Sequence, residues 1–219
     1  MGEENPEKNN LEKIFEFFDE VNKLKKSLRY SEIKEESHRD STAEHTWRLT
    51  LMIYIIADEL KLDIDILKAL KISLVHDLAE SLTGDIDAVR VANGEITKQE
   101  KNILEKEAIN KLKNLLPEKI GNKIYSLWED YEESKSKEAI FVKALDKFET
   151  MTHLMNVGWI PTTKNHYKID VHSFFAAYAN KPVKSFPELK QVLDIIKSKL
   201  KNEYEKYGFE WKQEYDNLE

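Results

Sequence analysis

Apolar residues recur at intervals of three and four positions along most of the chain, which is the spacing of one face of an α-helix. Over residues 11–28 this spacing predicts an amphipathic helix with one buried stripe. The stripe consists of Leu11, Ile14, Phe15, Phe18, Val21, Leu24 and Leu28. A polar stretch over residues 30–40 follows, so the first helix is expected to end before it.

Capping residues mark where later helices begin. Ser41 is followed three residues later by Glu44, and this capping box predicts a helix that runs to near residue 60. His45 then lies in the first helical turn. Thr97 and Glu100 form a second capping box, which predicts another helix.

Three further segments have helical spacing. A helix from about residue 65 carries His76 and Asp77 in its last turns. Pro117 is expected at the first position of a helix, where proline is tolerated best. Residues 139–155 are apolar on almost every side in their first half, so they predict a central, buried helix.

The predicted fold class is all-α. The chain has no convincing alternating pattern for a strand, and it has no internal repeat or glycine- and serine-rich linker. We expect a single-domain helical bundle over residues 1–219, with a core over about 11–157 and a helical extension over about 158–219. In the extension, residues 171–179 predict a short helix, and residues 185–188 predict the start of the last one.

Composition narrows the class of protein and the chemistry. The 219 residues are 41% hydrophobic and 34% charged, which is typical of a soluble globular protein. No apolar stretch approaches the ~18 residues that cross a membrane, and the first residues lack a signal-peptide pattern, so we expect a cytoplasmic protein without a membrane partner. The chain has no cysteine, so any metal ligands must be nitrogen or oxygen atoms.

The charge distribution favours a small ligand over a nucleic-acid polymer. The net charge of -7 is opposite to what contact with many phosphates requires. Arg29, Arg39 and Arg48 nevertheless lie within twenty positions around His45, and the planar fork of arginine suits bidentate phosphate contacts. Solvated surface charges are the alternative interpretation of each arginine.

Polar residues interrupt helices that are otherwise apolar. His76 and Asp77 do so as an adjacent pair, and His45 and Asp146 do so singly. A metal site formed by these four residues would explain all the interruptions. The alternatives are a structural role for each histidine and an ion pair of Asp146 with Lys143, one turn earlier on the same helix.

Helix geometry sets how the four residues would meet. Neighbouring side chains diverge by ~100°, so His76 and Asp77 can share an ion only beside their helix, with His45 and Asp146 closing the sphere. Glu80 lies on the same side of that helix and is placed to transfer protons. An aspartate after the Gly84 turn, Asp85, returns a second carboxylate, although turn formation alone would also explain it.

The ligand types restrict the metal. Two histidines and two carboxylates suit Mn²⁺, Co²⁺, Fe²⁺, Ni²⁺ or Zn²⁺ better than Mg²⁺. No histidine occurs between Asp77 and Asp146, so the extra imidazoles of a two-metal site are missing. We therefore expect one divalent ion.

The signature His45, His76-Asp77 and Asp146 resembles that of the HD-domain metal-dependent phosphohydrolase superfamily. The branch with the 5′-deoxynucleotidases and HD-domain-containing protein 2 is similar over about residues 24–149. The similar strings are LVHDLAESLTGDI, LLPEKI, LWEDYEE and AIFVKALDKFE. This resemblance implies a helical bundle of the HD-domain type.

The resemblance also implies an activity and residue roles. In that branch a divalent ion activates water for hydrolysis of deoxyribonucleoside 5′-monophosphates. Glu80 matches a glutamate that transfers protons, and Asp85 matches an aspartate near the sugar or the water. Arg29 matches the arginine that grips the phosphate. Homodimers are common among the relatives, so a homodimer is expected.

One position departs from the family pattern. A tryptophan usually follows the phosphate-binding arginine, whereas Tyr30 follows Arg29 here, so sugar and base selection stay open. Arg39 and Lys143 complete the expected substrate-binding set. The alternative functions are hydrolysis of another phosphate ester, such as a cyclic nucleotide or an alarmone, and non-catalytic nucleotide binding. A helical bundle without metal is the remaining structural alternative.

Overall fold

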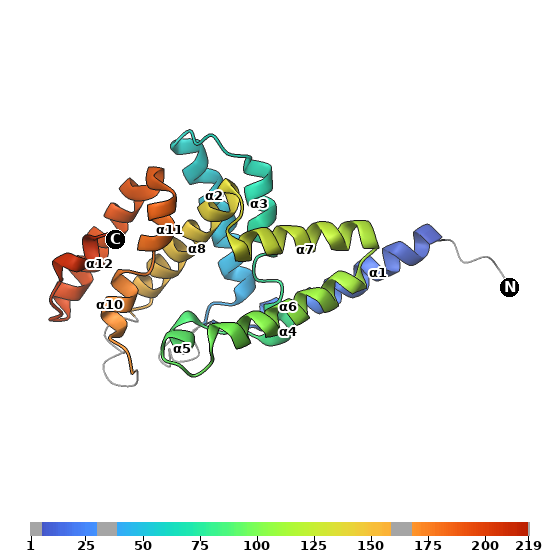
Figure 1. The fold of residues 1–219 in the computed structure, drawn as a ribbon, viewed down its shortest axis with the longest axis horizontal. Coiled ribbons are helices and arrows are strands. Elements are labelled where there is room, and N and C mark those ends of the chain that lie inside the picture. The colour runs from blue at the N-terminus through green and yellow to red at the C-terminus, as the bar shows by residue number, and fades with distance from the viewer. Residues whose placement is uncertain (1–5, 30–38, 159–167, 219) are drawn as a thin grey trace.

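The computed structural model describes residues 6–29, 39–158 and 168–218 of the chain. In these segments the secondary structure is helical apart from turns, loops and one isolated antiparallel bridge between Leu28 and Ser41 (Figure 1). The predicted all-α class is therefore confirmed. The helix α1 (Pro6–Val21) and the 3₁₀ turn η1 (Asn22–Lys25) precede this bridge and lead to Leu28.

Three helices form the centre of the molecule. α2 (Thr42–Glu59) and α3 (Ile66–Val75) pack against each other, and both pack against α8 (Lys137–Asn156). α8 is buried on several sides because helices surround it. Its fully or nearly fully buried apolar residues are Ala139, Phe141, Val142, Ala144, Leu145, Phe148, Met151 and Leu154.

A helical hairpin and α1 form a second layer. α6 (Lys98–Leu115) and α7 (Glu118–Glu133) pack together, α1 packs on α6, and the short helices α4 (Glu80–Thr83) and α5 (Ala88–Ala92) lead into α6. The hairpin needs a glycine at position 121, since an added Cβ there would lie 2.5 Å from the carbonyl oxygen of Lys113. A second apolar cluster fills the space between these helices. It contains Phe17, Val75, Leu78, Ile109, Leu112, Leu116 and Trp128.

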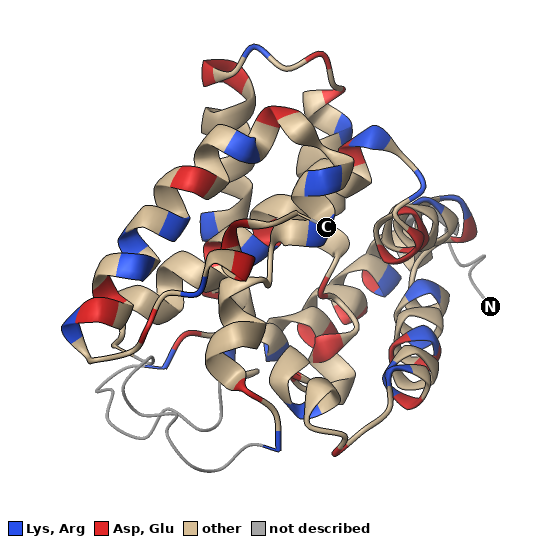
Figure 2. Cartoon of the chain, turned by 60° about the vertical axis from the view of Figure 1, so that its left-hand side comes forward, with Lys and Arg blue, Asp and Glu red and all other residues tan. Residues whose placement is uncertain are grey.

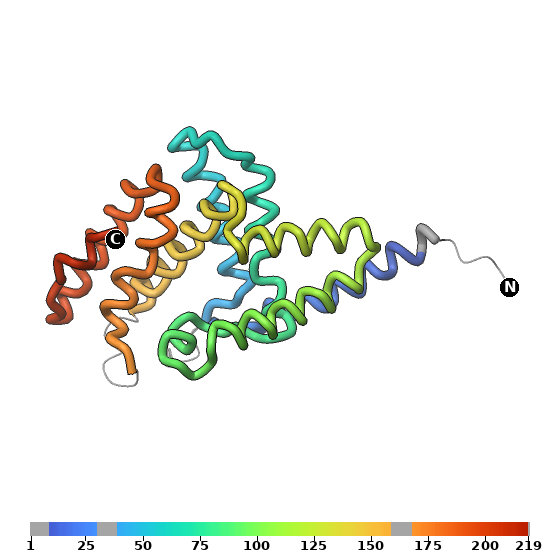
Figure 3. Tube along the Cα trace, in the orientation of Figure 1, coloured from blue at the N-terminus to red at the C-terminus, as the bar shows by residue number. Residues whose placement is uncertain are grey.

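The C-terminal helices cover another side of α8. α11 (Asn180–Ser185) and α12 (Lys190–Lys206) pack on it, after α10 (Val171–Ala176), and the turns η2 (Pro187–Leu189) and η3 (Gln213–Asp216) complete this part. Their apolar residues belong to the same cluster as those of α2, α3 and α8. α1 and α12 lie toward opposite ends of the long axis (Figure 3). The division into core and extension near residue 157 stays a prediction.

Two helix starts follow the predicted capping boxes, whereas Pro117, expected at the first position of its helix, is the N-cap before Glu118. Ser41 with Glu44 and Thr97 with Glu100 both form complete capping boxes. α3 ends at Val75, one turn earlier than expected, so His76 is its C-cap and Asp77 follows the helix.

The predicted stripe of the first helix is only partly buried. Leu11, Phe15 and Phe18 are more than half exposed, whereas Phe17 is 6% exposed and faces α6 and α7. Ile14, Val21 and Leu24 of the predicted stripe do pack against the same cluster as Phe17. The prediction was therefore wrong only for the exposed residues, because α1 carries apolar residues on two sides.

The surface carries both signs of charge. Figure 2 shows basic and acidic residues interspersed along the helices. Among the described residues, no helix has both the length and the apolar character needed to cross a membrane. The cytoplasmic location stays a prediction.

The central position of α2 predicts a large difference between two isoleucines of that helix. Ile53 is fully buried and Ile55 is 53% exposed. Ile53→Ala is expected to lower the free energy of unfolding by about 2–5 kcal/mol, because it leaves a cavity among three packed helices. Ile55→Ala is expected to change it by about 0.5 kcal/mol or less. Urea denaturation followed by circular dichroism measures both, and equal losses would contradict this description of the core.

Candidate metal centre

The four predicted ligands come from the three central helices. His45 lies in the first turn of α2, His76 and Asp77 lie at the C-terminal end of α3, and Asp146 lies in the middle of α8. Because these helices pack against one another, the three positions converge. The donor atoms of His45, His76 and Asp146 all lie within 4.8 Å of one another.

The distances fit one shared ion. His45 Nε2 lies 3.2 Å from Asp146 Oδ1 and 3.3 Å from His76 Nε2. Asp77 Oδ2 lies 3.0 Å from His76 Nε2 and 3.7 Å from His45 Nε2. Ligands about 2.1 Å from one ion, at tetrahedral or octahedral angles, lie about 3.0–3.4 Å apart. His45, His76 and Asp146 therefore have the spacing of a coordination shell, and Asp77 lies beside them next to His76.

The hydrogen bonds behind the histidines direct their lone pairs to the same point. His76 Nδ1 lies 2.7 Å from the carbonyl oxygen of Ser73, which only accepts, so Nδ1 carries the proton. His45 Nδ1 lies 2.5 Å from Glu149 Oε2, and the same tautomer follows. Both Nε2 lone pairs then face carboxylate oxygens with no donor between them, and a cation is what such a set of atoms binds.

The cluster carboxylates also act on the charge of its histidines. Burial opposes a positive charge on His76, but Asp77, Asp146 and the backbone of Ser73 together outweigh burial and raise the pKa of His76 to about 9. Burial likewise opposes the charge of Asp77, but His76 and His45 together outweigh it and lower the pKa of Asp77 to about 2. Protons and a metal ion therefore compete for the same lone pairs.

Glu80 lies at the start of α4, beside the cluster, and is buried. The hydroxyl of Thr42 donates to its Oε2 at 2.7 Å. Burial raises the pKa of Glu80 well above its usual range, and the charges of Asp77 and Asp85 raise it further. A carboxyl group with this position and a raised pKa suits proton transfer.

Asp85 follows Gly84, whose φ of 70° ends α4. Burial raises the pKa of Asp85, while the nearby Arg29 opposes that shift. A cation that sequence reasoning missed holds this loop: Lys101 Nζ on α6 donates to the carbonyl oxygen of Ile86 at 2.8 Å. Burial lowers the pKa of Lys101, but Glu105, Glu80 and the other nearby carboxylates outweigh burial and raise it.

The three predicted substrate-binding residues occupy different surroundings. Arg29 is largely buried, and its Nη2 donates to Thr150 Oγ1 at 3.2 Å. Arg39 Nη2 donates to the carbonyl oxygen of Arg29 at 3.2 Å. Lys143 Nζ donates to the carbonyl oxygen of Glu132 at 3.0 Å, so it contacts α7. Tyr30, at the position of the family's tryptophan, lies outside the described residues.

Two residues that support the ligands were not predicted. Tyr131 donates its hydroxyl to Asp146 Oδ2 at 3.0 Å, which leaves Oδ1 facing His45. Glu149 Oε2 accepts a hydrogen bond from His45 Nδ1, the ring nitrogen that does not face the cluster. A signal was available for Glu149, because it lies three residues after Asp146 and therefore on the same side of α8.

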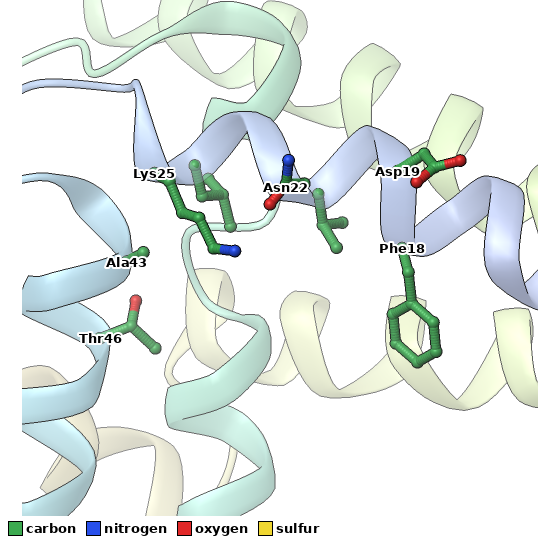
Figure 4. A pocket seen from close by; sticks show the side chains of 8 residues that line it. Phe18, Asp19, Asn22, Lys25, Ala43 and Thr46 are labelled. Carbon is green, nitrogen blue, oxygen red and sulfur yellow. The ribbon is translucent and has the colours of Figure 1, made fainter.

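A groove of ≈ 580 Å³ lies away from this centre, between α1 with η1 and the start of α2 (Figure 4). Phe18 and Asp19 line it from α1, Lys25 from η1, and Ala43 and Thr46 from α2. None of the predicted ligands is among its lining residues.

Comparison with known proteins places the chain in a family. The family model described as "HD domain" matches residues 21–190, which include every residue of the cluster. The chain belongs to the HD domain family. The predicted resemblance is thereby confirmed.

Curated relatives are identical to this HD domain protein at about a third of the aligned positions. The 5′-deoxynucleotidase HDDC2 of Dictyostelium discoideum is 37% identical over 142 residues, which cover 62% of this chain and 72% of the relative. The human 5′-deoxynucleotidase HDDC2 is 36% identical over 62% of this chain and 64% of its own length. The chain thus spans about two thirds of these relatives.

Solved structures share the fold. A predicted metal-dependent phosphohydrolase from Magnetospirillum magnetotacticum MS-1 has a TM-score of 0.68 at 24% identity, over 91% of this chain and 94% of the other. A conserved hypothetical protein from Pyrococcus furiosus has a TM-score of 0.64 at 25% identity, over 84% of this chain and 99% of the other. The structural similarity therefore covers more of this chain than the sequence similarity to the curated relatives does.

Glu105 predicts a pH dependence of stability. It lies on α6, 3.5 Å from Lys101, and burial raises its pKa to about 7 although Lys101 opposes the shift. The folded state therefore holds a proton that the unfolded state loses above about pH 4.5. The free energy of unfolding should fall as pH rises from about 4.5 to about 7, by up to about 3 kcal/mol from this group.

Glu105→Gln should remove this part of the pH dependence, and urea denaturation across pH 4.5–7.5 measures it. Glu107→Gln, at an exposed position of the same helix, should keep the slope of the unaltered protein. Parallel pH profiles for the Glu105→Gln variant and the unaltered protein would contradict the raised pKa.

Proposed function

We propose that this HD domain protein is a metal-dependent phosphohydrolase that removes the 5′-phosphate from nucleoside 5′-monophosphates, with deoxyribonucleotides favoured. The observation that carries the proposal is the convergence of His45, His76, Asp77 and Asp146 beside the buried Glu80. The relatives named 5′-deoxynucleotidase support the substrate class.

The cluster is proposed to hold one divalent ion, which is Mn²⁺, Co²⁺, Fe²⁺, Ni²⁺ or Zn²⁺. His45 and His76 would bind it through Nε2, and Asp77 and Asp146 through one carboxylate oxygen each. When bound, such an ion supplies Lewis-acid chemistry: it polarises a phosphoryl oxygen and makes a water acidic enough to attack phosphorus at neutral pH. No nucleophile from the protein is then required.

Proton transfer is assigned to Glu80. Thr42 holds its Oε2, so Oε1 is the oxygen proposed to exchange protons. As the oxygen of water bonds to phosphorus and the bond from phosphorus to O5′ breaks, the departing oxygen needs the proton that the water loses. Asp85 is proposed to assist near the sugar or the water, since its charge already acts on Glu80.

The phosphate needs positive charge, because Asp77, Glu80 and Asp85 would otherwise repel it. Arg29 is proposed to supply that charge, since its guanidinium acts electrostatically on both Glu80 and Asp85. Its fork suits two phosphate oxygens. We propose that two further residues complete the substrate-binding set. These are Arg39, which donates to the carbonyl oxygen of Arg29, and Lys143.

Phosphate release from a nucleotide panel tests the function. Protein stripped with a chelator and reloaded with each of the five ions should release phosphate from dAMP, dGMP or dTMP with at least one ion. Glu80→Gln should lower kcat by about 10²-fold or more, since it removes the proton-transfer group. Asp146→Asn should abolish the response to added metal.

The panel also separates the alternatives. Glu107→Gln is the control and should keep full activity. The ribonucleotides, a cyclic nucleotide and a pyrophosphorylated nucleotide form the remaining arms. Cleavage of only these last two would replace the proposed substrate class, and no release from any compound with any ion would refute hydrolysis.

We further propose a homodimer formed through α1 and α2. Leu11, Phe15 and Phe18 on α1 and Trp47 and Tyr54 on α2 are all more than half exposed, at helical spacing. The groove of Figure 4 joins the two helices. The groove is lined by Asp19 on α1 and Lys25 on η1. Asp19 of one copy would pair with Lys25 of the other when two copies of this face meet about a twofold axis.

Light scattering tests the homodimer. The protein should have twice the 25.7 kDa mass of the chain. Phe15→Ser combined with Trp47→Ser should give monomers, because it places hydroxyl groups in an apolar interface. Ile195→Ser, at an equally exposed position of α12, should leave the dimer intact. A monomer before any substitution would refute the proposal.

A further inference from the structure

Glu149 is a fully buried carboxylate on α8, directly behind the metal cluster. Its Oε2 bonds His45 Nδ1 at 2.5 Å and lies 3.7 Å from Arg29 Nη1. Its Oε1 accepts from Arg48 Nη1 at 3.0 Å. One side chain thus contacts a predicted metal ligand, the predicted phosphate-binding arginine and a second, partly exposed arginine.

The contacts around Glu149 hold it in one orientation. A buried carboxylate without partners would cost several kcal/mol, and the two arginines offset that cost. Arg48 is itself fixed, because its Nη2 donates to Thr152 Oγ1 at 2.8 Å. Both oxygens of Glu149 therefore have partners: His45 and Arg48 lie on α2, and Arg29 follows η1.

This arrangement has a consequence for His45. Its Nε2 faces the cluster only while its ring keeps one orientation and Nδ1 keeps a proton. A carboxylate behind a metal-binding imidazole fixes both properties and makes the nitrogen a stronger ligand. Because the same oxygen faces Arg29, the position of the arginine depends on the same carboxylate.

A second metal site is the competing interpretation of Glu149. The carboxylate also forms a group with Asp40 and His153 whose donor atoms lie within 4.8 Å of one another. Arg29 and Arg48 bring two positive charges to Glu149, and these disfavour a further cation at that carboxylate. The hydrogen bond to His45 is the better account of its position.

We propose that Glu149 is a positioning residue that links the metal ligand His45 to the phosphate-binding Arg29, and that Arg48 keeps Glu149 in place. The part of the proposal that concerns Arg29, called the Arg29 half below, rests on the proposed function. The part that concerns His45, called the His45 half, requires only that the cluster bind a metal.

Metal affinity tests the His45 half without any measurement of activity. Equilibrium dialysis of the chelator-stripped protein against Co²⁺ or Zn²⁺ gives the dissociation constant. Glu149→Gln should raise it by about 10- to 100-fold, because the neutral amide orients His45 less firmly. Arg48→Gln, at a partly exposed position, should raise it by up to about tenfold. Glu138→Gln, on the same helix but paired with Lys68, is the control and should leave it unchanged.

Kinetics at saturating metal test the Arg29 half. Glu149→Gln should raise KM for the nucleotide, because Arg29 loses its buried partner, and Glu149→Asp should restore part of the loss. An unchanged KM would overturn the Arg29 half. Metal affinity unchanged in both Glu149→Gln and Arg48→Gln would overturn the His45 half. Metal binding without any nucleotide hydrolysis would refute the proposed function alone, since the affinity measurement still decides the His45 half.

Discussion

Charged and polar side chains are buried at the junction of α2, α3 and α8, and the surrounding structure must compensate for their burial. Two imidazoles and two carboxylates lie among apolar helices, where an unpaired charge costs several kcal/mol. Hydrogen bonds with the surrounding polar groups offset that cost. The hydroxyl of Tyr131 bonds Asp146, the carbonyl of Ser73 accepts from one histidine, and Glu149 bonds the other. The remaining lone pairs face one another at the junction, which makes it a candidate cation site.

The second layer of helices gives the site an acidic side and a basic side. Glu80 and Asp85 lie on the segment from α4 toward α5, and Lys101 on α6 holds that segment through the backbone of Ile86. Arg29 approaches after η1 and bonds a threonine of α8. When a phosphate monoester is hydrolysed, the leaving oxygen takes up a proton and the phosphoryl group carries negative charge. A site with acidic groups on one side and a basic group on the other therefore suits this reaction.

The helices were largely predictable because their signals are local. Capping boxes and the apolar run of α8 depend only on residues a few positions apart, and the structure has both. The buried face of α1 was predicted wrongly in part, since Phe17 packs while Phe15 and Phe18 are exposed. α11 was not predicted, and its six residues are too few to show a helical period. Which of two apolar faces packs depends on the neighbouring helices.

The candidate ligands could be found without the structure, since His45, His76, Asp77 and Asp146 stand out as polar residues in apolar helices. The sequence also marked Glu80 as sharing a side of the chain with two of them. The packing of α2, α3 and α8 sets which nitrogen of each histidine faces the cluster, and it brings Glu149 to His45 across 104 positions of sequence. Helical periodicity reports which residues share a face of one helix, whereas the meeting of two helices depends on packing over the whole core.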